Sequence, residues 1–412
     1  MASAPWITPE FIRAIPKSDL HVHLDGSLRM ETLIELARAQ KVELPSYTSE
    51  GLRETVFKDH YADLGEYLHG FKYTCAVLRE AEALSRVAYE LALDNFAEGV
   101  RYIEPRFAPQ LCAGAGLTIE EVLAAVHEGL EKAKAEINRR KEIKSGEEPP
   151  FDFGIIGCAM RKFDERFSPY YQNFISCHRY SPLPQVYPLA SLELARALVD
   201  IRDKKGISVV GFDLAGEEKG WPANAHRRAF EYAHQHFLKK TLHAGEAYGP
   251  SSIFQAITQC HADRIGHGTH LFATELVEHL DAPEREVYTR ALIQYIADQR
   301  ITIEVCPTSN LQTIPAIGKM ENHPVGRMIS EKLSVSLCTD NRLVSHTTVC
   351  DEILQTVNTF SVSPHDLREM IIYGFKRSFS PLPYRQKRAY VRQIIDYYED
   401  TEKRFKIDAK NP

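Results

Sequence analysis

The amino-acid sequence predicts an α/β protein: a closed (β/α)8 TIM barrel with a helical insertion after the first strand and a C-terminal helical cap. Three observations lead to this prediction. Eight short apolar runs alternate with longer segments of helical periodicity, which is typical of a parallel sheet. The 412 residues are enough for one barrel with insertions. No glycine-rich phosphate loop follows the first apolar run, which disfavours an open doubly wound sheet, the alternative fold.

The candidate strands are short apolar runs bounded by turn residues. In chain order they cover residues 19–24, 100–107, 151–160, 207–216, 240–246, 263–271, 301–307 and 333–340. Between these runs, apolar residues spaced three and four apart predict amphipathic helices. The clearest examples cover residues 82–99, 119–140, 192–206 and 287–300.

Some segments exceed what a minimal barrel needs. We expect residues 1–412 to form a single domain, with the barrel at about 18–345 and C-terminal helices at about 346–405. Several helices should lie between residues 30 and 98. Residues 164–189, rich in proline, tyrosine and serine, should form an ordered loop insertion. After the eighth strand, we expect a cap of helices at residues 351–360, 365–379 and 385–405.

The bulk composition excludes several classes of protein. A net charge of -6 gives no basic excess of the kind that nucleic-acid binding requires. The sequence has no run of eighteen apolar residues, and its first twenty residues lack the apolar core of a signal peptide. Its eight cysteines include no C-x-x-C pair, which favours free thiols in a reducing compartment. We therefore expect a cytoplasmic protein with no nucleic-acid or membrane partner.

The first candidate strand carries two histidines separated by one residue, in the stretch SDLHVHLDGS. Because side chains alternate along a strand, His21 and His23 share one face with Asp25, while Val22 and Leu24 share the other. A buried imidazole costs free energy unless a partner satisfies it. Alone, this stretch is compatible with a solvated edge strand or with half of a metal site.

Further polar residues lie at the ends of the later candidate strands. In a TIM barrel, catalytic residues are found at the C-terminal ends of the strands. The residues at those ends are Asp213, Gly216, His243, Glu246, His267, Glu304, Asp340 and Asn341. If the strands close into a barrel, several histidines and carboxylates converge on one face, which predicts a catalytic site.

The residue types at this face predict a metal-dependent hydrolase. Three imidazoles and one carboxylate form a ligand set that suits zinc and leaves room for a water. They are His21, His23, His243 and Asp340. A bound divalent ion lowers the pKa of its water towards neutrality. His267 could orient that water or accept its proton, and a protonated Glu246 could donate to a substrate ring nitrogen. The HExxH and cytidine-deaminase signatures are absent, so the residues alone leave the substrate open.

Six motifs follow one another between His21 and Asn341: HVHLDGS, DLAGEE, LHAGE, RIGHG, EVCPTSN and SLCTDN. As an ordered set they strongly resemble the adenosine deaminase family of the amidohydrolase superfamily. The resemblance implies one Zn2+ per chain. It also implies hydrolytic deamination of adenosine and 2'-deoxyadenosine to the corresponding inosine and ammonia, a reaction of purine salvage.

The resemblance also implies roles for the residues that match the family's motifs. The matches to the zinc ligands are His21, His23, His243 and Asp340. Glu246 matches the acid that protonates purine N1. His267 matches the residue that positions the attacking water, a task that Asp340 shares.

Other matches concern substrate binding and ligand orientation. Gly216 matches the backbone donor to purine N3, and Asp25 matches the contact to the ribose 5'-hydroxyl. Asp213 and Glu304 look like the acids that orient the metal ligands, although buried structural carboxylates would fit nearly as well. An apolar gate over the purine is matched by four side chains at helical spacing: Leu64, Tyr67, Leu68 and Phe71.

Two features depart from the family's pattern. Asn341 stands where many members carry an aspartate, but an asparagine amide can always donate to purine N7, whereas a carboxyl must first be protonated. The segment 164–189 is longer than expected. It could flank the pocket, form a subunit contact, or have no catalytic role.

The alternative substrates are adenine, AMP and 5'-modified adenosines such as aminodeoxyfutalosine or methylthioadenosine analogues. Asp25 favours a neutral nucleoside, because a carboxylate accepts a hydrogen bond from a 5'-hydroxyl but repels a 5'-phosphate. A catalytically inactive nucleoside-binding module is the alternative from another class, and the complete set of ligands and acid disfavours it. The sequence leaves open the native metal, the tolerated 5' and 2' substituents and the oligomeric state.

Overall fold

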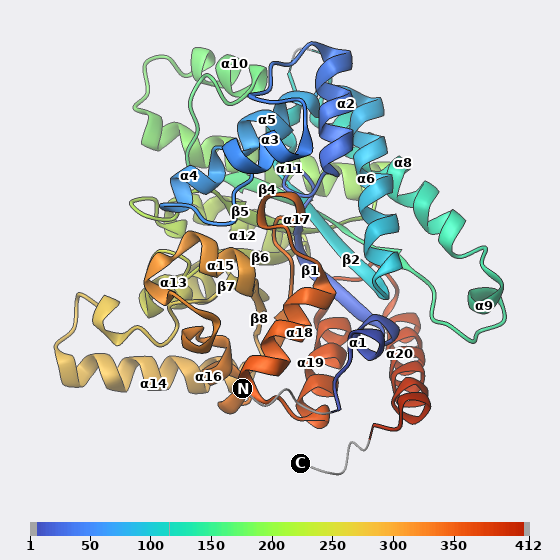
Figure 1. Cartoon of the computed structure of the whole chain (residues 1–412). Coiled ribbons are helices and arrows are strands. Elements are labelled where there is room, and N and C mark those ends of the chain that lie inside the picture. Colours follow the sequence, from blue (N-terminus) through green and yellow to red (C-terminus); the bar gives the residue numbers. More distant parts are fainter. Residues whose placement is uncertain (1–5, 115, 408–412) are drawn as a thin grey trace.

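The central element of the fold is a parallel sheet that closes into a barrel (Figure 1). The computed structural model describes residues 6–114 and 116–407. The strands are β1 (Lys17–His23), β2 (Val100–Phe107), β3 (Asp152–Phe153), β4 (Ile155–Met160), β5 (Val209–Ala215), β6 (Lys239–Ala244), β7 (Arg264–His267), β8 (Thr302–Val305) and β9 (Val335–Leu337). They are ordered β1-β2-β4-β5-β6-β7-β8-β9, and the short β3 pairs with β2 beside β4.

Two backbone hydrogen bonds close the barrel between its first and last strands. The N–H of His23 donates to the carbonyl of Asp340 at 2.6 Å, and the N–H of Asp340 donates to the carbonyl of His21 at 2.8 Å. The predicted (β/α)8 barrel is therefore confirmed, with all eight candidate strands in place. The same bonds bring residues at opposite ends of the sequence together at the carboxyl end of β1.

Helices fill the connections between the strands. Before and after β1 lie α1 (Pro9–Ala14), α2 (Met30–Gln40), α3 (Ser49–Thr55), α4 (Leu64–Leu68), α5 (Phe71–Val77) and α6 (Ala81–Ala97). From β2 to β6 lie α7 (Pro109–Cys112), α8 (Ile119–Ile137), α9 (Lys141–Lys144), α10 (Pro169–Cys177), α11 (Leu183–Lys205), η1 (Ala223–His226) and α12 (Arg227–Gln235). After β6 lie α13 (Pro250–Gln259), η2 (Thr274–Leu276), α14 (Ala282–Gln299), α15 (Pro307–Thr313), η3 (Pro315–Ile317), η4 (Met320–Asn322) and α16 (Val325–Ser330). After β9 lie α17 (Arg342–Ser345), α18 (Val349–Phe360), α19 (Pro364–Arg377) and α20 (Tyr384–Phe405).

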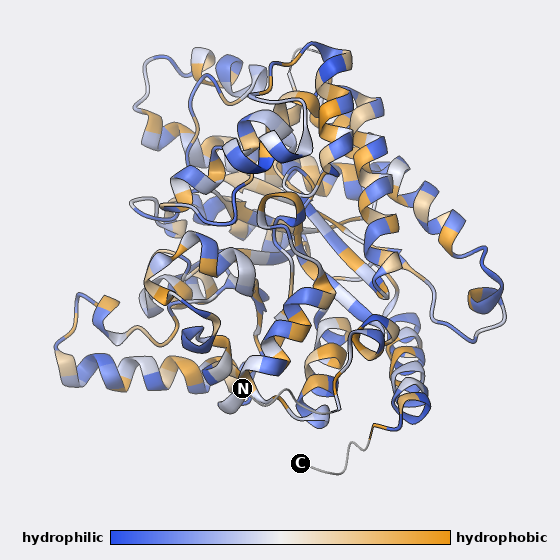
Figure 2. Ribbon diagram, viewed as in Figure 1, coloured by the Kyte–Doolittle hydropathy of each residue, from blue (hydrophilic) through white to orange (hydrophobic). Residues whose placement is uncertain are grey.

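The outer helices are amphipathic, and their ends carry the expected signals. Hydrophobic and hydrophilic residues alternate around the turns of α6, α14 and α20 (Figure 2). Capping boxes start α8 at Thr118 and Glu121, and α14 at Asp281 and Glu284. Gly206 ends α11 in the left-handed conformation. Helix α6 packs on β2 and on α8, and the side chains of β1 and β2 are buried throughout.

The helical insertion after β1 is confirmed, and it lies at the carboxyl end of that strand (Figure 1). Hydrogen bonds connect its α2–α5 portion to residues that follow β9. The hydroxyl of Tyr61 donates to the carbonyl of Val344 at 3.1 Å, and a ring nitrogen of His346 lies 2.6 Å from the carbonyl oxygen of Phe57. The insertion therefore covers the end of the barrel where the predicted site residues lie.

The prediction of an ordered loop at residues 164–189 is wrong in part, because much of this segment is helical. It contains α10 and the first residues of α11. Ser168 caps α10 by accepting from the N–H of Tyr171, and the Tyr171 ring stacks on Phe163 with centroids 4.1 Å apart. Proline is compatible with the first turn of a helix, so proline in this segment was no reliable sign of a loop. The segment packs beside the carboxyl ends of β4 and β5, in a cluster that includes Cys158 and Ala215.

The C-terminal helices exist at the predicted positions, but they are not simply a cap. Helix α19 lies against β1 and β9, and Gly374 in α19 closely approaches Ser18 in β1. It therefore completes the outer ring of helices where the first and last strands meet. Helix α20 packs on α1 and α19. Within the described residues, no helix combines the length and the apolar character that a membrane crossing requires.

We predict that Gly129→Ala destabilises the fold, because α6 and α8 approach too closely at this position for a side chain. A Cβ atom on Gly129 would lie 2.0 Å from the carbonyl oxygen of Ser85. Overpacking of this kind costs about 1–3 kcal/mol. The midpoint of urea-induced unfolding should fall accordingly. Gly116→Ala is the matched control, because a Cβ there meets nothing within 4 Å; equal midpoints for both variants would contradict the prediction.

Candidate metal centre

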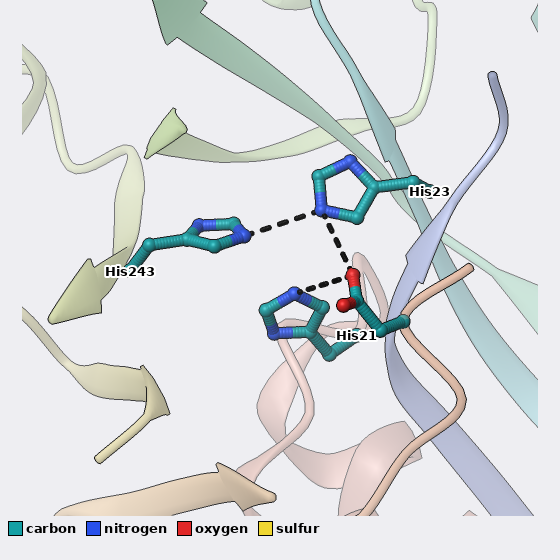
Figure 3. Close-up of side chains that lie close together, drawn as sticks. His21, His23 and His243 are labelled. Atoms are coloured by element: carbon teal, nitrogen blue, oxygen red, sulfur yellow. Dashed lines mark hydrogen bonds and ion pairs between the residues drawn. The ribbon is translucent and has the colours of Figure 1, made fainter. Parts of the chain in front are cut away.

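Four side chains from opposite parts of the sequence converge at the carboxyl end of the barrel. They are His21, His23, His243 and Asp340, and one ligand atom of each lies within 4.8 Å of those of the others. Figure 3 shows the three imidazole rings turned towards one another. The Nε2 atoms of His23 and His243 are 3.2 Å apart. Oδ1 of Asp340 lies 3.5 Å from Nε2 of His21 and 3.4 Å from Nε2 of His23.

These distances fit a single metal ion. Four ligands placed 2.0–2.1 Å from one ion at the corners of a tetrahedron lie about 3.3 Å from each other. Nε2 of His21 is buried and has no hydrogen-bond partner, as expected for an atom whose partner is a metal. Burial lowers the pKa of His21 to about 4 and holds the pKa of His23 well below its usual value. Both rings are therefore neutral at pH 7, the form that binds metal.

The other ring nitrogens of two ligands are held by buried carboxylates. Nδ1 of His21 lies 3.0 Å from Oε2 of Glu304, and Nδ1 of His243 lies 3.1 Å from Oδ2 of Asp213. Such bonds leave Nε2 of each ring free to bind a metal ion and fix the orientation of the ring. The structure thus brings Glu304 and Asp213 together with the ligands, as expected if they orient them.

Arg106 in β2, which sequence reasoning missed, joins these two carboxylates. Its guanidinium donates to Asp213 at 2.9 Å and to Glu304 at 2.8 Å. Burial opposes their ionisation, but the charge of Arg106, together with the adjacent histidine, holds the pKa of each carboxyl well below its usual value. Arg264 also donates to Glu304 and pairs with Glu104. The barrel interior beneath the candidate ligands is therefore a connected layer of buried charges.

Two residues of the site have a left-handed backbone, at φ 64° for His267 and φ 58° for Asp340. This conformation costs a non-glycine residue about 1–3 kcal/mol and is concentrated at functional sites. Ser309 donates to Oδ2 of Asp340 at 2.6 Å, which leaves Oδ1 to face the histidines. Gly266 leaves room for the ring of His21, because a Cβ at this position would lie 3.0 Å from that ring, a tight contact.

Glu246 follows β6 in a loop that Glu218 organises. The side-chain oxygens of Glu218 accept from the backbone N–H groups of Gly245, Glu246, Ala247 and Tyr248 at 2.7–3.0 Å. They also accept from the hydroxyl of Ser252 at 2.6 Å. Burial raises the pKa of the Glu246 carboxyl, which favours its protonated form, and Oε1 lies 3.9 Å from Nε2 of His267. Sequence reasoning missed Glu218, although it is part of the DLAGEE motif.

Asp25 lies beside the metal ligands with one unpaired oxygen. Its Oδ1 is buried, has no hydrogen-bond partner and lies 3.9 Å from Nδ1 of His23. Burial raises the pKa of Asp25 to about 7. The groups that influence this pKa include Asp340, which is acidic and raises it, and the thiol of Cys75, which lowers it through a hydrogen bond. An unsatisfied buried oxygen of this kind is suited to a ligand hydroxyl.

The four predicted gate residues differ in their surroundings. The helix breaks after Leu68, so Leu64, Tyr67 and Leu68 lie in α4 and Phe71 begins α5. Tyr67 is fully buried, and its hydroxyl accepts from Nδ2 of Asn341 at 2.8 Å and lies 2.9 Å from Oγ of Ser345. The ring centroids of Phe71 and His23 are 6.5 Å apart.

Leu64 and Leu68 are half-buried and pack on the main core.

Asn341 closely approaches Gly26, which has no room for a Cβ. Gly216 directly follows β5 with φ 93°, a conformation that suits glycine. The predicted site residues thus lie at one end of the barrel, and their roles towards a substrate stay predictions.

Comparisons with known proteins agree with this geometry. Residues 16–165 and 175–397 match the adenosine deaminase family. The chain is 35% identical over 376 residues to an adenosine deaminase of Mycobacterium marinum, covering 90% of this chain and 92% of the relative. It is 36% identical over 392 residues to adenosine deaminase 1 of Streptomyces coelicolor, covering 94% of this chain and 88% of the relative. A probable adenosine deaminase of Dictyostelium discoideum is 35% identical over 92% of this chain, which spans only 42% of that longer protein.

Solved structures support the same fold. An adenine deaminase from Arthrobacter aurescens superposes with a TM-score of 0.72 at 22% identity, covering 94% of this chain and all of that one. A zinc-bound amidohydrolase from Burkholderia ambifaria superposes with a TM-score of 0.76 at 19% identity, covering 99% of this chain and 98% of that one. At these identities the likeness concerns the barrel and its surrounding helices.

We predict that Glu218→Gln disturbs the loop that carries Glu246. A neutral amide cannot accept all of the hydrogen bonds that both oxygens of Glu218 accept now. Turnover should fall by at least about tenfold. The metal content should stay unchanged, since Glu218 contacts no candidate ligand atom. The measurements are turnover of a 6-aminopurine nucleoside and metal analysis.

Glu217→Gln is the matched control for this variant. Glu217 is the neighbouring residue but is partly exposed and pairs with the partly exposed Lys162, an interaction that contributes little. Equal turnover of the two variants would show that the carboxylate of Glu218 does not position the loop.

Proposed function

The chain belongs to the adenosine deaminase family, and we propose that it is a zinc-dependent enzyme that hydrolyses adenosine and 2'-deoxyadenosine to the corresponding inosine and ammonia. The observation that carries this proposal is the convergence of three imidazoles and Asp340 next to Glu246 and His267. A zinc ion held by the four ligands would polarise a water molecule into a nucleophile at neutral pH. Zinc is proposed from the donor set, which combines histidine nitrogens with a carboxylate oxygen.

Glu246 is the proposed proton donor to the purine ring. Burial raises its pKa, which favours the protonated carboxyl that can donate to N1 of the purine. Protonation at N1 withdraws electrons from C6 and makes that carbon open to attack. The proton and the attacking oxygen must reach neighbouring atoms of the same ring, and Glu246 and His267 lie close enough to serve both.

His267 and Asp340 are proposed to hold the attacking water on the C6 side of the purine. His267 ends β7 and Asp340 follows β9, and both have a left-handed backbone conformation. Their fixed orientation limits the rearrangement that the reaction requires, which is how a preorganised site lowers a barrier. Gly216 is proposed to bind purine N3 through its backbone N–H, and Asn341 to bind N7 through the amide hydrogen that Tyr67 does not use.

Asp25 supports a neutral nucleoside as the substrate. Its unpaired Oδ1 can accept from the ribose 5'-hydroxyl. A 5'-phosphate would need a cation, and the groups that act on Asp25 include the acidic Asp340. The free base adenine would leave this oxygen unpaired. The substrate is therefore proposed to be a small purine nucleoside.

The test of the function is direct. Purified zinc-loaded enzyme is offered adenosine, 2'-deoxyadenosine, adenine, AMP and 5'-modified adenosines, and the loss of the aminopurine absorbance is followed together with ammonia release. The proposal expects the highest kcat/KM with adenosine or 2'-deoxyadenosine. A higher kcat/KM with adenine or AMP would replace the proposed substrate, and no turnover of any aminopurine would refute deamination.

We predict that Glu246→Gln loses turnover and keeps its metal. Glutamine has the same shape but no carboxyl proton to transfer, so kcat should fall by about 10²–10⁴-fold. Zinc should stay at one per chain, because Glu246 is outside the ligand set. Steady-state kinetics and metal analysis check this. Loss of metal together with activity would mean that Glu246 supports the metal and that its assigned role is wrong.

We predict that Asp25 discriminates between substrates with and without a 5'-hydroxyl. A substrate without the 5'-hydroxyl leaves the buried acceptor of Asp25 unsatisfied, which costs about 1–3 kcal/mol, so kcat/KM should be about 10- to 100-fold higher for adenosine than for 5'-deoxyadenosine. Asp25→Ala should remove most of this difference by lowering kcat/KM for adenosine alone. An equal loss for both substrates would indicate that Asp25 supports His23 instead of binding the ribose.

A further inference from the structure

A chain of buried polar groups connects His267 to the backbone of α16. Nδ2 of Asn310, in α15, lies 3.0 Å from Nδ1 of His267. Oδ1 of the same asparagine lies 3.3 Å from Nε2 of His323. The backbone N–H of Val325 lies 3.1 Å from Nδ1 of His323. All three side chains are almost completely buried, so water does not compete for these bonds.

The hydrogen bond between the backbone N–H of Val325 and Nδ1 of His323 has a known direction. A backbone N–H can only donate, so Nδ1 of His323 must accept from Val325. A neutral imidazole that accepts at Nδ1 carries its proton at Nε2. Burial lowers the pKa of His323 to about 3, so the ring is neutral at pH 7. His323 therefore donates through Nε2 to Asn310.

The bond from His323 in turn fixes the orientation of the Asn310 side-chain amide. The atom of its amide that accepts from His323 must be the oxygen, so the NH2 group is turned towards His267. Nδ1 of His267 consequently accepts a hydrogen bond. The orientation of the amide and of both rings thus follows from one backbone N–H, with no other assumption about where the protons are.

We propose that His323 and Asn310 are positioning residues that keep Nδ1 of His267 without a proton and the ring proton on Nε2, the nitrogen that faces Glu246. This inference rests on the proposed function, and it distinguishes between two roles for His267. With Nε2 protonated, the ring offers the site an N–H donor. It holds the oxygen of the attacking water in place and does not take its proton at that nitrogen.

The opposite tautomer is disfavoured by the same contacts. A proton on Nδ1 of His267 would face the NH2 group of Asn310, so that two donors would meet in a buried place with neither satisfied. Rotation of the asparagine amide would not remove the conflict, because its NH2 group would then face the Nε2–H of His323. Both partners must change together for the tautomer to change.

The first test reads the tautomer directly. The zinc-loaded enzyme is labelled with 15N in its histidine rings, and the couplings between ring nitrogens and ring protons are recorded by NMR. His267→Gln identifies the signals of His267 by their loss. The proposal expects the Nε2–H form of His267 and of His323. A proton on Nδ1 of His267 would overturn it, whether or not the enzyme deaminates adenosine.

The second test reverses the direction of the chain. Asn310→Asp places an acceptor where the NH2 group now lies, which should put a proton on Nδ1 of His267, and the 15N spectrum of this variant shows whether Nε2 has lost its own proton. We expect kcat to fall by about 10²-fold, with KM and zinc content within about threefold of the wild type, as for a group that acts in the transition state alone. A changed tautomer with unchanged kcat would refute the role of Nε2–H.

His323 provides a matched pair of variants. His323→Gln retains a donor near the position of Nε2 and should keep kcat within about threefold of the wild type, whereas His323→Leu lacks a donor and should lower kcat about tenfold or more. Equal kcat values for the two variants would contradict the proposal. If Asn310→Asp does not fold, the wild-type spectrum and the His323 pair still decide the question.

Discussion

Arg106 is the residue on which the geometry of the centre depends. Three imidazoles can aim Nε2 at one point only if their rings cannot rotate, and the rings of His21 and His243 are held by Glu304 and Asp213. Two carboxylates buried in one layer repel each other and are costly to desolvate unless a cation lies between them. The guanidinium of Arg106 provides that cation through two nitrogens in a fixed plane. Strand β2, which contributes no candidate ligand, thereby fixes the ligands on β1 and β6.

The sequence predicted the barrel and most of the centre because both depend on local patterns. Apolar runs mark the strands, and in a barrel the chain order places their ends together, so His21 and Asp340 could be matched although they are far apart in sequence. The contacts of Arg106 and Glu218 could not be predicted in this way. Arg106 lies inside a strand, where its partner depends on the register of the neighbouring strands, and the N–H groups that Glu218 binds have no side-chain signature.

The errors in the fold have a similar origin. Prolines between residues 164 and 189 indicated a loop, yet Ser168 and Pro169 start α10 and Pro182 precedes α11. Tertiary aromatic packing against Phe163 stabilises the segment, and a local pattern does not report such packing. The C-terminal helices could be located in the sequence. Their place could not, because the packing of α19 on β1 depends on Gly374 meeting a strand near the other end of the chain.

The bond between Tyr67 and Asn341 has a consequence for how the protein meets small molecules. It joins α4 to the end of the barrel where the side chains of the centre are buried, so a molecule can reach the centre only while this contact is open. The bond can form again once the molecule is bound, because Asn341 donates to Tyr67 through only one of its two amide hydrogens. The apparent affinity is then the intrinsic affinity reduced by the fraction of time that the entrance is open, and each 1.4 kcal/mol of closure reduces it about tenfold. Tighter closure would therefore shield the chemistry from bulk water at the expense of how readily the molecule enters and leaves.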